Sequence, residues 1–449
     1  MSGSRKHIIV FAFPFASHPA PLLALVRRIS ASAPTAVFSF FSTEKSNAEN
    51  FPKDNPLGYE SIKACSVDDG LPPGFMPSGN PVEPVQLFLK AVPCNFYKAV
   101  KAAEEAVGIK VSCLLTDAFF GFGADMAREM GVPWVPVWFS GDRPLLAHIN
   151  TDLIRKTFGS GDFEGKNLEF IPGFESVRAM DLPQDIIEPN PNSEFSVMID
   201  KMAATLSQAT AIAINSVEEL DPLIVKQLRS HLQKVLSIGP ITPSCPMTPF
   251  PDSYGCIPWL DEQKPASVVY ISFGSVITPP PHELTALSEA LEEIGVPFLW
   301  SFRGNAEEKL PQDFVRRTRE SSKSKIVSWA PQLDVLRHKA VAAFLTQCGW
   351  NSLLESFIGG VPTIMRPFFG DQQLNRLSIE TLWRAGVGLE RGVITKTGTI
   401  AALKRVLFTE DGVQMRQRAS ELNGLVMRAV ETSGSSTKNF ESLVDIVTK

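Results

Sequence analysis

Short apolar runs alternate with helical patterns through the first half of the chain. Residues 7–15 form one such run, which is typical of a strand buried on both faces of a parallel sheet. A helix is predicted to begin at residues 19–21, since proline suits a first helical turn. Further apolar runs lie at 36–41, 111–116, 134–139 and 209–215, and helical patterns lie at 85–107 and 121–129. Strands that alternate with helices predict a parallel, doubly wound α/β sheet.

A proline-rich stretch interrupts this alternation. Residues 241–258 carry five prolines and no apolar periodicity, so we interpret them as an interdomain linker. The alternation then restarts with apolar runs at 267–273, 297–302, 325–328, 341–346 and 361–365. The pattern therefore predicts a second sheet of the same class.

Composition narrows the class of protein. A chain of 449 residues is long enough for two or three domains, and 44% apolar residues can fill large cores. A net charge of −5 argues against a nucleic-acid binder, which needs a basic face. The six cysteines form no CxxC pair, so we expect no zinc site. The same cysteine usage favours a reducing, cytoplasmic location. No run reaches the roughly 18 apolar residues of a membrane helix, and early prolines argue against a signal peptide.

The densest chemical pattern runs from Trp329 to Gln372. Within it, a strand-like run ends at the turn QCGWNS, residues 347–352, and a helical pattern follows. Strand, glycine turn and helix start form a geometry that binds phosphate, because free amides and the helix dipole favour an anion there. Glu355, one helical turn further on, is placed to accept hydrogen bonds from sugar hydroxyls, and Trp329 offers a flat face for a base. Each piece alone also fits an ordinary βαβ segment with a buried tryptophan.

This 44-residue stretch resembles the donor-binding box of plant UDP-dependent glycosyltransferases of secondary metabolism. The resemblance rests on its length, on WAPQ at its start, on CGWNS with a glutamate three residues later, and on DQ at its end. It extends over essentially the full chain and is closest to flavonoid and anthocyanidin 3-O-glucosyltransferases. The resemblance implies a GT-B fold, in which two Rossmann-like domains face a central cleft.

The resemblance also implies how the chain is divided and what it binds. We expect an acceptor-binding domain at 1–243, a UDP-sugar-binding domain at 244–436, and a helix at 437–449 that crosses back to the first domain. The expected ligands are a flavonoid acceptor and UDP-glucose as co-substrate, handled by a monomer. The implied donor-binding residues are Ser17, Ser275, Trp329, Ala330, Gln332, Gln347, Gly349, Trp350, Asn351, Ser352, Glu355, Asp371 and Gln372.

Three further points concern the donor site, and the sugar preference among them is implied by the resemblance. No Asp-x-Asp motif stands on the facing loops, so we expect transfer without a metal ion, with charge met by hydrogen-bond donors and helix dipoles. Family members with a terminal glutamine in the box mostly use glucose, and galactose users often carry histidine, so Gln372 favours glucose. On sequence alone, Ser275 is better explained as a helix N-cap or turn residue, and its place near the diphosphate is what the resemblance implies.

His18 and Asp117 are the candidate catalytic residues. Both follow predicted strands, and ligands of open α/β sheets bind beyond the carboxyl ends of strands. Histidine is a general base near neutral pH without tuning, and a carboxylate beside it fixes its tautomer. A loop histidine is otherwise polar surface, and an aspartate after a strand is often a helix cap. The resemblance matches the two residues to the family's base and its acidic partner.

Gln347 departs from the family, which usually has histidine at this position. That histidine donates a hydrogen bond to a donor phosphate oxygen. A glutamine amide also donates, but it is never cationic and its reach differs. We expect weakened donor binding and activity, by roughly ten- to a hundredfold if the bond is lost.

The acceptor pocket is expected mainly in the first domain, because a flat polyphenol suits an aromatic slot. Phenylalanines on apolar runs are equally well explained as core. Asp142 and Arg143 are unusual for the family and either re-tune the pocket or, the favoured interpretation, form a solvated pair at its rim. The candidates are Phe15, Phe119, Phe120, Phe139, Ser140, His148, Gln184 and, from the second domain, Phe369.

The leading hypothesis is inverting transfer of glucose to the 3-hydroxyl of a flavonol or anthocyanidin. A second hypothesis, suggested by Gln347, is a UDP-sugar binding protein with little turnover. Intact His18 and Asp117 argue against it, since binding alone does not need them. A third is another sugar-nucleotide enzyme, such as an epimerase, which the plant-type box disfavours.

Overall fold

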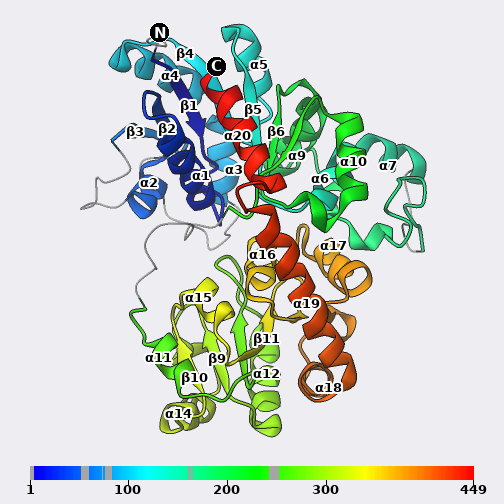
Figure 1. Ribbon diagram of the computed structural model, residues 1–449. Helices are drawn as coiled ribbons and strands as arrows, with labels where there is room; N and C mark the ends of the chain where they lie inside the picture. Colours follow the sequence, from blue (N-terminus) through cyan, green and yellow to red (C-terminus); the bar gives the residue numbers. More distant parts are fainter. Residues whose placement is uncertain are drawn as a thin grey trace. The chain divides into compact units, whose positions relative to one another are not determined.

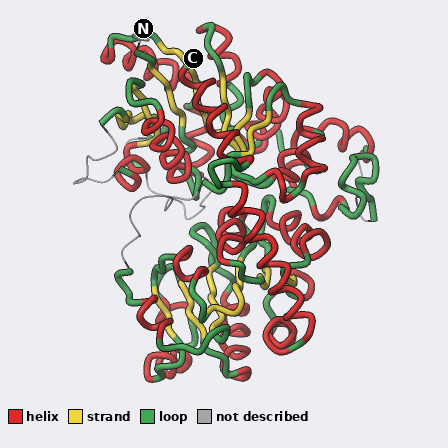
Figure 2. The backbone as a smooth tube through the Cα atoms, in the orientation of Figure 1, coloured by secondary structure: helices red, strands yellow, loops and turns green. Residues whose placement is uncertain are grey.

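The structure, a computed structural model, describes residues 5–51, 60–72, 74–75, 83–159, 163, 165–241 and 252–449. The chain divides into two compact units (Figure 1). The first unit holds residues 1–243 together with 429–449, and the second holds residues 244–428. In each unit the strands lie between helices (Figure 2), as expected for doubly wound sheets.

Among its described residues, the first unit contains a parallel sheet of seven strands in the order β3-β2-β1-β4-β5-β6-β7. The strand order reverses between β1 and β4, and such a switch point is where ligands bind in open α/β sheets. The strands are β1 (His7–Phe11), β2 (Val37–Thr43), β3 (Ile62–Val67), β4 (Val111–Asp117), β5 (Trp134–Trp138), β6 (Ile212–Ile214) and β7 (Val235–Ser237).

Prolines and capping side chains set the ends of several helices in the first unit. Proline occupies the first turn of α1, and the Asp221 side chain accepts from a backbone N–H to cap α10. The helical pattern predicted at 85–107 forms two helices, with Pro93 between them. The helices are α1 (Pro19–Ser32), α2 (Glu44–Asn50), α3 (Glu83–Ala91), α4 (Cys94–Val107), α5 (Gly123–Met130), α6 (Asp142–Ile149), α7 (Thr151–Phe158), α8 (Gln184–Ile187), α9 (Glu194–Thr205) and α10 (Pro222–His231).

The last helix of the chain, α20 (Ser435–Thr448), belongs to the first unit. Its side chains Phe440, Leu443 and Val447 lie in the same buried apolar cluster as residues of β1, β2 and β4. Asn439 Nδ2 donates to the Ser237 carbonyl at 3.0 Å, which ties α20 to the end of β7. Figure 1 shows α20, in red, against the strands of this unit.

In the second unit, residues 252–428 contain a parallel sheet of six strands in the order β10-β9-β8-β11-β12-β13. Its order also reverses once, between β8 and β11, so the two sheets have equivalent switch points. The strands are β8 (Val268–Ser272), β9 (Phe298–Ser301), β10 (Lys325–Val327), β11 (Val341–Thr346), β12 (Thr363–Met365) and β13 (Gly386–Gly388).

Helices cover this second sheet as well. One segment, Ser378–Trp383, is a π-helix, a rare form that concentrates at functional sites. No helix of the described ranges in either unit is long and apolar enough to span a membrane. The helices are α11 (Cys256–Asp261), α12 (Pro281–Ile294), α13 (Ala306–Lys309), α14 (Gln312–Glu320), α15 (Gln332–Arg337), α16 (Trp350–Gly359), α17 (Gln372–Leu377), α18 (Lys396–Phe408) and α19 (Glu410–Ala429).

The architecture confirms the predicted class of two doubly wound sheets and corrects it in places. Strands β3, β7 and β13 were not predicted. The predicted linker at 241–258 overlaps α11, since Cys256–Asp261 is helical, and residues 242–251 lie outside the described part of the chain.

Candidate active site

His18 and Asp117 meet at the switch point of the first sheet. His18 follows β1 and precedes α1, and Asp117 ends the neighbouring strand β4. His18 Nδ1 donates to Asp117 Oδ2 at 2.7 Å, and Asp117 Oδ1 accepts from the Phe119 N–H at 3.0 Å. The aspartate side chain is buried, and the histidine side chain keeps 19% exposure. A carboxylate can only accept, so the His18 proton sits on Nδ1 and the lone pair of Nε2 is free to take a proton.

Aromatic rings surround His18. The ring centroids of Phe119, Phe13 and Phe139 lie 4.8, 5.3 and 5.9 Å from that of His18. Phe15 packs edge-on against Phe13 at 5.3 Å. The partly exposed His18 ring is therefore set in an apolar wall, which suits a flat aromatic ligand.

The other predicted acceptor residues lie in different environments. Phe120 is 1% exposed among core aromatics, a position that favours a packing role. His148 is buried against Trp138, and burial lowers its pKa to about 4, so its ring is neutral at pH 7. Its Nδ1 has no hydrogen-bond partner among the described residues. Gln184 is exposed at the start of α8, and Ser140 is half-buried.

The solvated pair predicted for Asp142 and Arg143 is wrong. Asp142 is 3% exposed and accepts from Ser216 Oγ, and burial raises the pKa of its carboxyl to about 7. The Arg143 side chain is only 13% exposed, donates to the Gly173 carbonyl at 2.7 Å and pairs with Asp221 at 2.6 Å. The two neighbours point to different partners because adjacent residues of a helix do not share a face.

In the second unit, the predicted turn lies between β11 and α16, as the sequence pattern indicated. Cys348 has φ +70°, a left-handed conformation that is strained for a residue with a Cβ. Gly349 is the N-cap of α16, and no side chain caps its first turn. The N-terminus of this helix, the positive end of its dipole, therefore adjoins the turn and favours an anion there.

Gln347 lies between two glycines at the switch point of the second sheet. Its Oε1 accepts from Thr346 Oγ1 at 3.1 Å. A Cβ added to Gly274, in the loop after β8, would lie 2.4 Å from Gln347 Nε2, and one added to Gly349 would lie 3.0 Å away. No described residue accepts a hydrogen bond from Nε2, so that amide group can donate to a ligand.

Glu355 is held by Gln332. Gln332 Nε2 donates to Glu355 Oε2 at 2.6 Å and to Ser352 Oγ at 3.0 Å, and its Oε1 accepts from Tyr270 OH at 3.1 Å. Burial raises the pKa of Glu355 to about 7, and the Gln332 hydrogen bond opposes this shift. The side chain of Gln332 thus makes its hydrogen bonds to other residues of the protein. The carboxyl of Glu355 can accept further hydrogen bonds from a ligand.

The loop after β12 ends at Asp371 and Gln372. Gln372 Oε1 accepts from the N–H groups of Phe368 and Phe369 at 2.8 and 3.3 Å, which leaves its Nε2 as a donor. Asn375 Nδ2 donates to Asp371 Oδ2 at 2.9 Å and to the Cys348 carbonyl at 3.1 Å. The sequence interpretation missed Asn375, although its spacing of four from Asp371 is a helical contact distance.

The remaining predicted residues present different surfaces. Ser17, Ser275 and Phe369 are exposed. Trp329 is half-buried, and Ala330 and Trp350 are buried. The Trp350 indole packs against Trp383 at 6.2 Å, so this residue can offer a ligand little beyond its backbone. Asn351 and Ser352 are half-buried in the first turn of α16.

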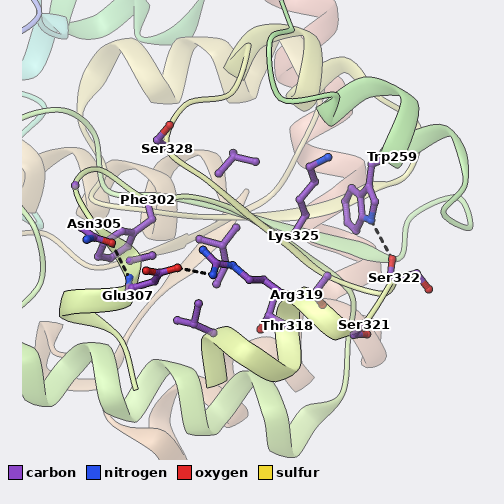
Figure 3. A pocket seen from close by; sticks show the side chains of 16 residues that line it. Trp259, Phe302, Asn305, Glu307, Thr318, Arg319, Ser321, Ser322, Lys325 and Ser328 are labelled. Atoms are coloured by element: carbon purple, nitrogen blue, oxygen red, sulfur yellow. Dashed lines mark hydrogen bonds and ion pairs between the residues drawn. The ribbon is translucent and has the colours of Figure 1, made fainter. Parts of the chain in front are cut away.

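A separate cavity of about 400 Å³ lies beside the edge strand β10 (Figure 3). Trp259, Phe302 and Lys325 are among its lining residues, and none of the predicted site residues lines it. Its Glu307 and Arg319 side chains pair with each other. No group of three or more His, Cys, Asp or Glu side chains arranged to hold a metal ion occurs within the described ranges.

Comparison with solved structures defines the class of this two-sheet protein. An anthocyanidin 3-O-glucosyltransferase crystallised with UDP matches with a TM-score of 0.92 and 38% identity, over 99% of each chain. Two parallel-sheet Rossmann-like units with equivalent switch points, in a chain that superimposes on such an enzyme, define a glycosyltransferase of the GT-B fold.

Sequence comparisons place the chain within that class. Residues 256–416 match the family described as UDP-glucoronosyl and UDP-glucosyl transferase. A flavonoid 3-O-glucosyltransferase of Medicago truncatula is 47% identical over 100% of this chain and 98% of that protein. An anthocyanidin 3-O-galactosyltransferase of Rhododendron delavayi is 47% identical over 98% of this chain and 97% of that protein. The chain therefore belongs to the UDP-glucoronosyl and UDP-glucosyl transferase family and is a UDP-glycosyltransferase.

Proposed function

We propose that the protein transfers glucose from UDP-glucose to the 3-hydroxyl of a flavonol or anthocyanidin, with inversion at the anomeric carbon. The His18–Asp117 hydrogen bond of 2.7 Å, at a sheet switch point and within an aromatic wall, carries this proposal. Relatives named for this activity, at 47% identity over the full chain, support it.

In the proposed reaction His18 is the general base. Its Nε2 takes the proton of the acceptor hydroxyl while that oxygen forms a bond to C1 of the sugar. The bond from C1 to the phosphate oxygen breaks, and UDP leaves with the electron pair. Asp117 fixes the tautomer of the ring and stabilises the imidazolium that forms. The developing positive charge on the sugar makes the transition state oxocarbenium-like.

The proposed donor site takes its residues from the second unit, except for Ser17 of the first. The amides of Asn351 and Ser352 at the start of α16 would meet the diphosphate, with Gln347 Nε2 beside them and Ser275 and Ser17 near the leaving group. Glu355 would accept hydrogen bonds from the ribose hydroxyls, and the Trp329 ring and the Ala330 backbone would contact the base. Charge is met by these donors and the helix dipole, and we expect no metal requirement.

The sugar is proposed to contact Asp371 and Gln372. Asp371 accepts hydrogen bonds and Gln372 donates through Nε2, so together they can read several hydroxyls. We propose glucose as the preferred sugar. Because a galactosyltransferase is as similar to this chain as the glucosyltransferase, the choice needs a direct test.

The acceptor is proposed to lie along Phe15, Phe119 and the edge of His18, with His148 offering a neutral ring nitrogen. Gln184, Ser140 and Phe369 are the further proposed contacts. A cytoplasmic, monomeric enzyme remains our prediction from the sequence.

A second function is favoured by one observation. Gln347 cannot be cationic, so the protein could hold a UDP-sugar with little turnover. Incubation of UDP-glucose with quercetin and cyanidin, without added metal, tests both functions by chromatography with mass detection. A 3-O-hexoside supports the transferase. UDP-glucose binding by calorimetry without any glycoside supports the binding protein, and UDP-glucose consumption without an acceptor would favour an epimerase-like reaction instead.

A further inference from the structure

One buried amide joins two parts of the proposed donor site. Asn375 lies on α17 and is 2% exposed. Its Nδ2 donates to the Cys348 carbonyl at 3.1 Å and to Asp371 Oδ2 at 2.9 Å. The Cys348 carbonyl belongs to the turn before α16, and Asp371 ends the loop after β12. A single NH₂ group therefore uses both of its hydrogens to hold two loops together.

The turn at Cys348 needs such support. Its φ of +70° is strained for a residue with a side chain, and strained conformations persist only where the surroundings fix them. The Cys348 N–H donates to Thr346 Oγ1 at 3.3 Å, and the side chain is buried with Sγ 3.4 Å from Met365 Sδ. Asn375 supplies the contact to the carbonyl, which completes the restraint on this residue.

The carboxylate of Asp371 is positioned by the same amide. A carboxylate has two oxygens that rotate together, so a hydrogen bond to Oδ2 fixes the direction in which Oδ1 points. The backbone N–H of Asn375 also donates to the Asp371 carbonyl at 2.9 Å, which fixes the positions of the two residues relative to each other. The pair therefore has one defined arrangement.

We infer that Asn375 is a positioning residue for the donor, setting both the phosphate-binding turn at Cys348 and the sugar-facing carboxylate of Asp371. The inference rests on the proposed function, because it takes UDP-glucose as the ligand of these loops. It predicts two separable effects. Loss of the hydrogen bond to Cys348 weakens the binding of UDP itself. Loss of the hydrogen bond to Asp371 weakens only the contribution that the sugar makes to the affinity for UDP-glucose.

The test compares variants by calorimetry with UDP and with UDP-glucose. Asn375→Leu is close in size and removes both hydrogen bonds. We expect its UDP affinity to fall about threefold and its UDP-glucose affinity about tenfold, since a net hydrogen bond is worth a few-fold in binding. The measured quantity is the ratio of the UDP-glucose affinity to the UDP affinity. Substitution of a residue with a merely structural role would leave this ratio unchanged.

A matched control is available in the same unit. Asn423 Nδ2 donates to the Ile358 carbonyl at 2.6 Å near the other end of α16. Asn423→Leu removes a comparable tie between an amide and a backbone carbonyl, and we expect a lower melting temperature with an unchanged affinity ratio. In an Asp371→Asn background, Asn375→Leu should still weaken UDP but no longer change the sugar contribution.

The outcomes are separable from those of the proposed function, because binding is measured without an acceptor. If the wild-type protein binds UDP-glucose and Asn375→Leu leaves the affinity ratio at the value of Asn423→Leu, the inference is overturned and the transferase function stands. A wild-type protein that binds no UDP-glucose overturns both. Should Asn375→Leu not fold, Asn375→Asp keeps the shape, cannot donate to Cys348 and repels Asp371, so it must show the same fall in the ratio.

Discussion

Gln347 and Gly274 come from neighbouring loops and fit together without room for a methyl group. A Cβ on Gly274 would lie 2.4 Å from Gln347 Nε2, closer than real Cβ contacts allow. The glycine also has φ +73°, a backbone conformation that favours glycine, and an added side chain would push the Gln347 amide aside. The placement of the Gln347 amide thus depends on the loop after β8.

Gly274→Ala is expected to weaken UDP-glucose binding by about tenfold, because the added Cβ displaces the end of the flexible Gln347 side chain, and its amide then loses the place from which it is proposed to donate to the phosphate. Gly295→Ala is the matched control, since Gly295 has φ +67° but no atom within 4 Å of an added Cβ. Both variants should lose about 1 kcal/mol of folding stability from backbone strain. Equal donor affinities in the two alanine variants, measured by calorimetry, would show that the contact with Gln347 is unimportant.

Asp117→Asn is expected to lower kcat by a factor of about 10²–10⁴ with little change in donor KM. The amide can keep the bond from the Phe119 N–H through its oxygen, but its NH₂ would face His18 Nδ1 and move the ring proton to Nε2. Turnover of quercetin, with a melting curve as control for folding, is the measurement. His18→Ala should cost about as much, and the double variant no more than the larger single loss. A kcat of Asp117→Asn within twofold of wild type would remove the base assignment.

Gln347→His is expected to raise donor affinity and turnover by roughly ten- to a hundredfold, the worth of a hydrogen bond to a charged group. The reason is that an imidazole between Gly274 and Gly349 can donate to the phosphate with a different reach and can carry charge. Steady-state kinetics with varied UDP-glucose checks this. No gain in turnover or donor affinity contradicts the idea that glutamine is costly at this position.

Gln372→Glu and Gln372→Ala separate the two ends of one side chain. Glutamate keeps an oxygen for the N–H groups of Phe368 and Phe369 but loses the Nε2 donor, whereas alanine loses both. We expect glutamate to weaken UDP-glucose use by about tenfold while the loop persists, and alanine to weaken it further. Rates with UDP-glucose and UDP-galactose are compared. If Gln372→Ala leaves the use of both sugars unchanged, Gln372 does not select the sugar.

Glu355 should make donor binding depend on pH. Its carboxyl has a pKa of about 7 in the free protein, against 4.5 ordinarily, so the unliganded fold loses stability as pH rises between these values. Ribose hydroxyls that donate to the carboxylate favour its ionised form, so UDP affinity should rise from pH 6 to 8 and binding should release a proton. Calorimetry in buffers of different ionisation enthalpy measures this release, and Glu355→Gln should abolish it. A UDP affinity that falls over this pH range would contradict the assignment.

The sequence pattern predicted the buried central strands of both sheets well and their edge strands poorly. Central strands such as β4 and β11 are continuous apolar runs because both of their faces are covered. The edge strand β3 has exposed residues at its centre, so its sequence IKACSV resembles a loop. The edge strand β13 is only Gly-Val-Gly, and its pairing with β12 has no local signal. Pro258 falls in the first turn of α11, where its missing N–H costs nothing, so proline content alone misplaced the end of the linker.

The candidate site divides in the same way. Residues at strand ends, such as His18 and Asp117, could be paired from the sequence because neighbouring parallel strands end at one edge. The sequence could not reveal that Asp142 and Arg143 turn to Ser216 and Asp221, since these partners are more than seventy residues away. The need for Gly274 and the two bonds of Asn375 likewise arise only from contacts between loops.

The return of α20 to the first unit has a consequence for how the protein is made. Phe440, Leu443 and Val447 fill part of the core of the unit that begins the chain. On the ribosome, residues 244–428 are complete before these side chains exist, so the unit synthesised first is finished last. Until α20 has been synthesised, the apolar surface that it covers stays open, and a chain cut short before Ser435 would leave the part made earlier, the first unit, exposed to chaperones and proteases.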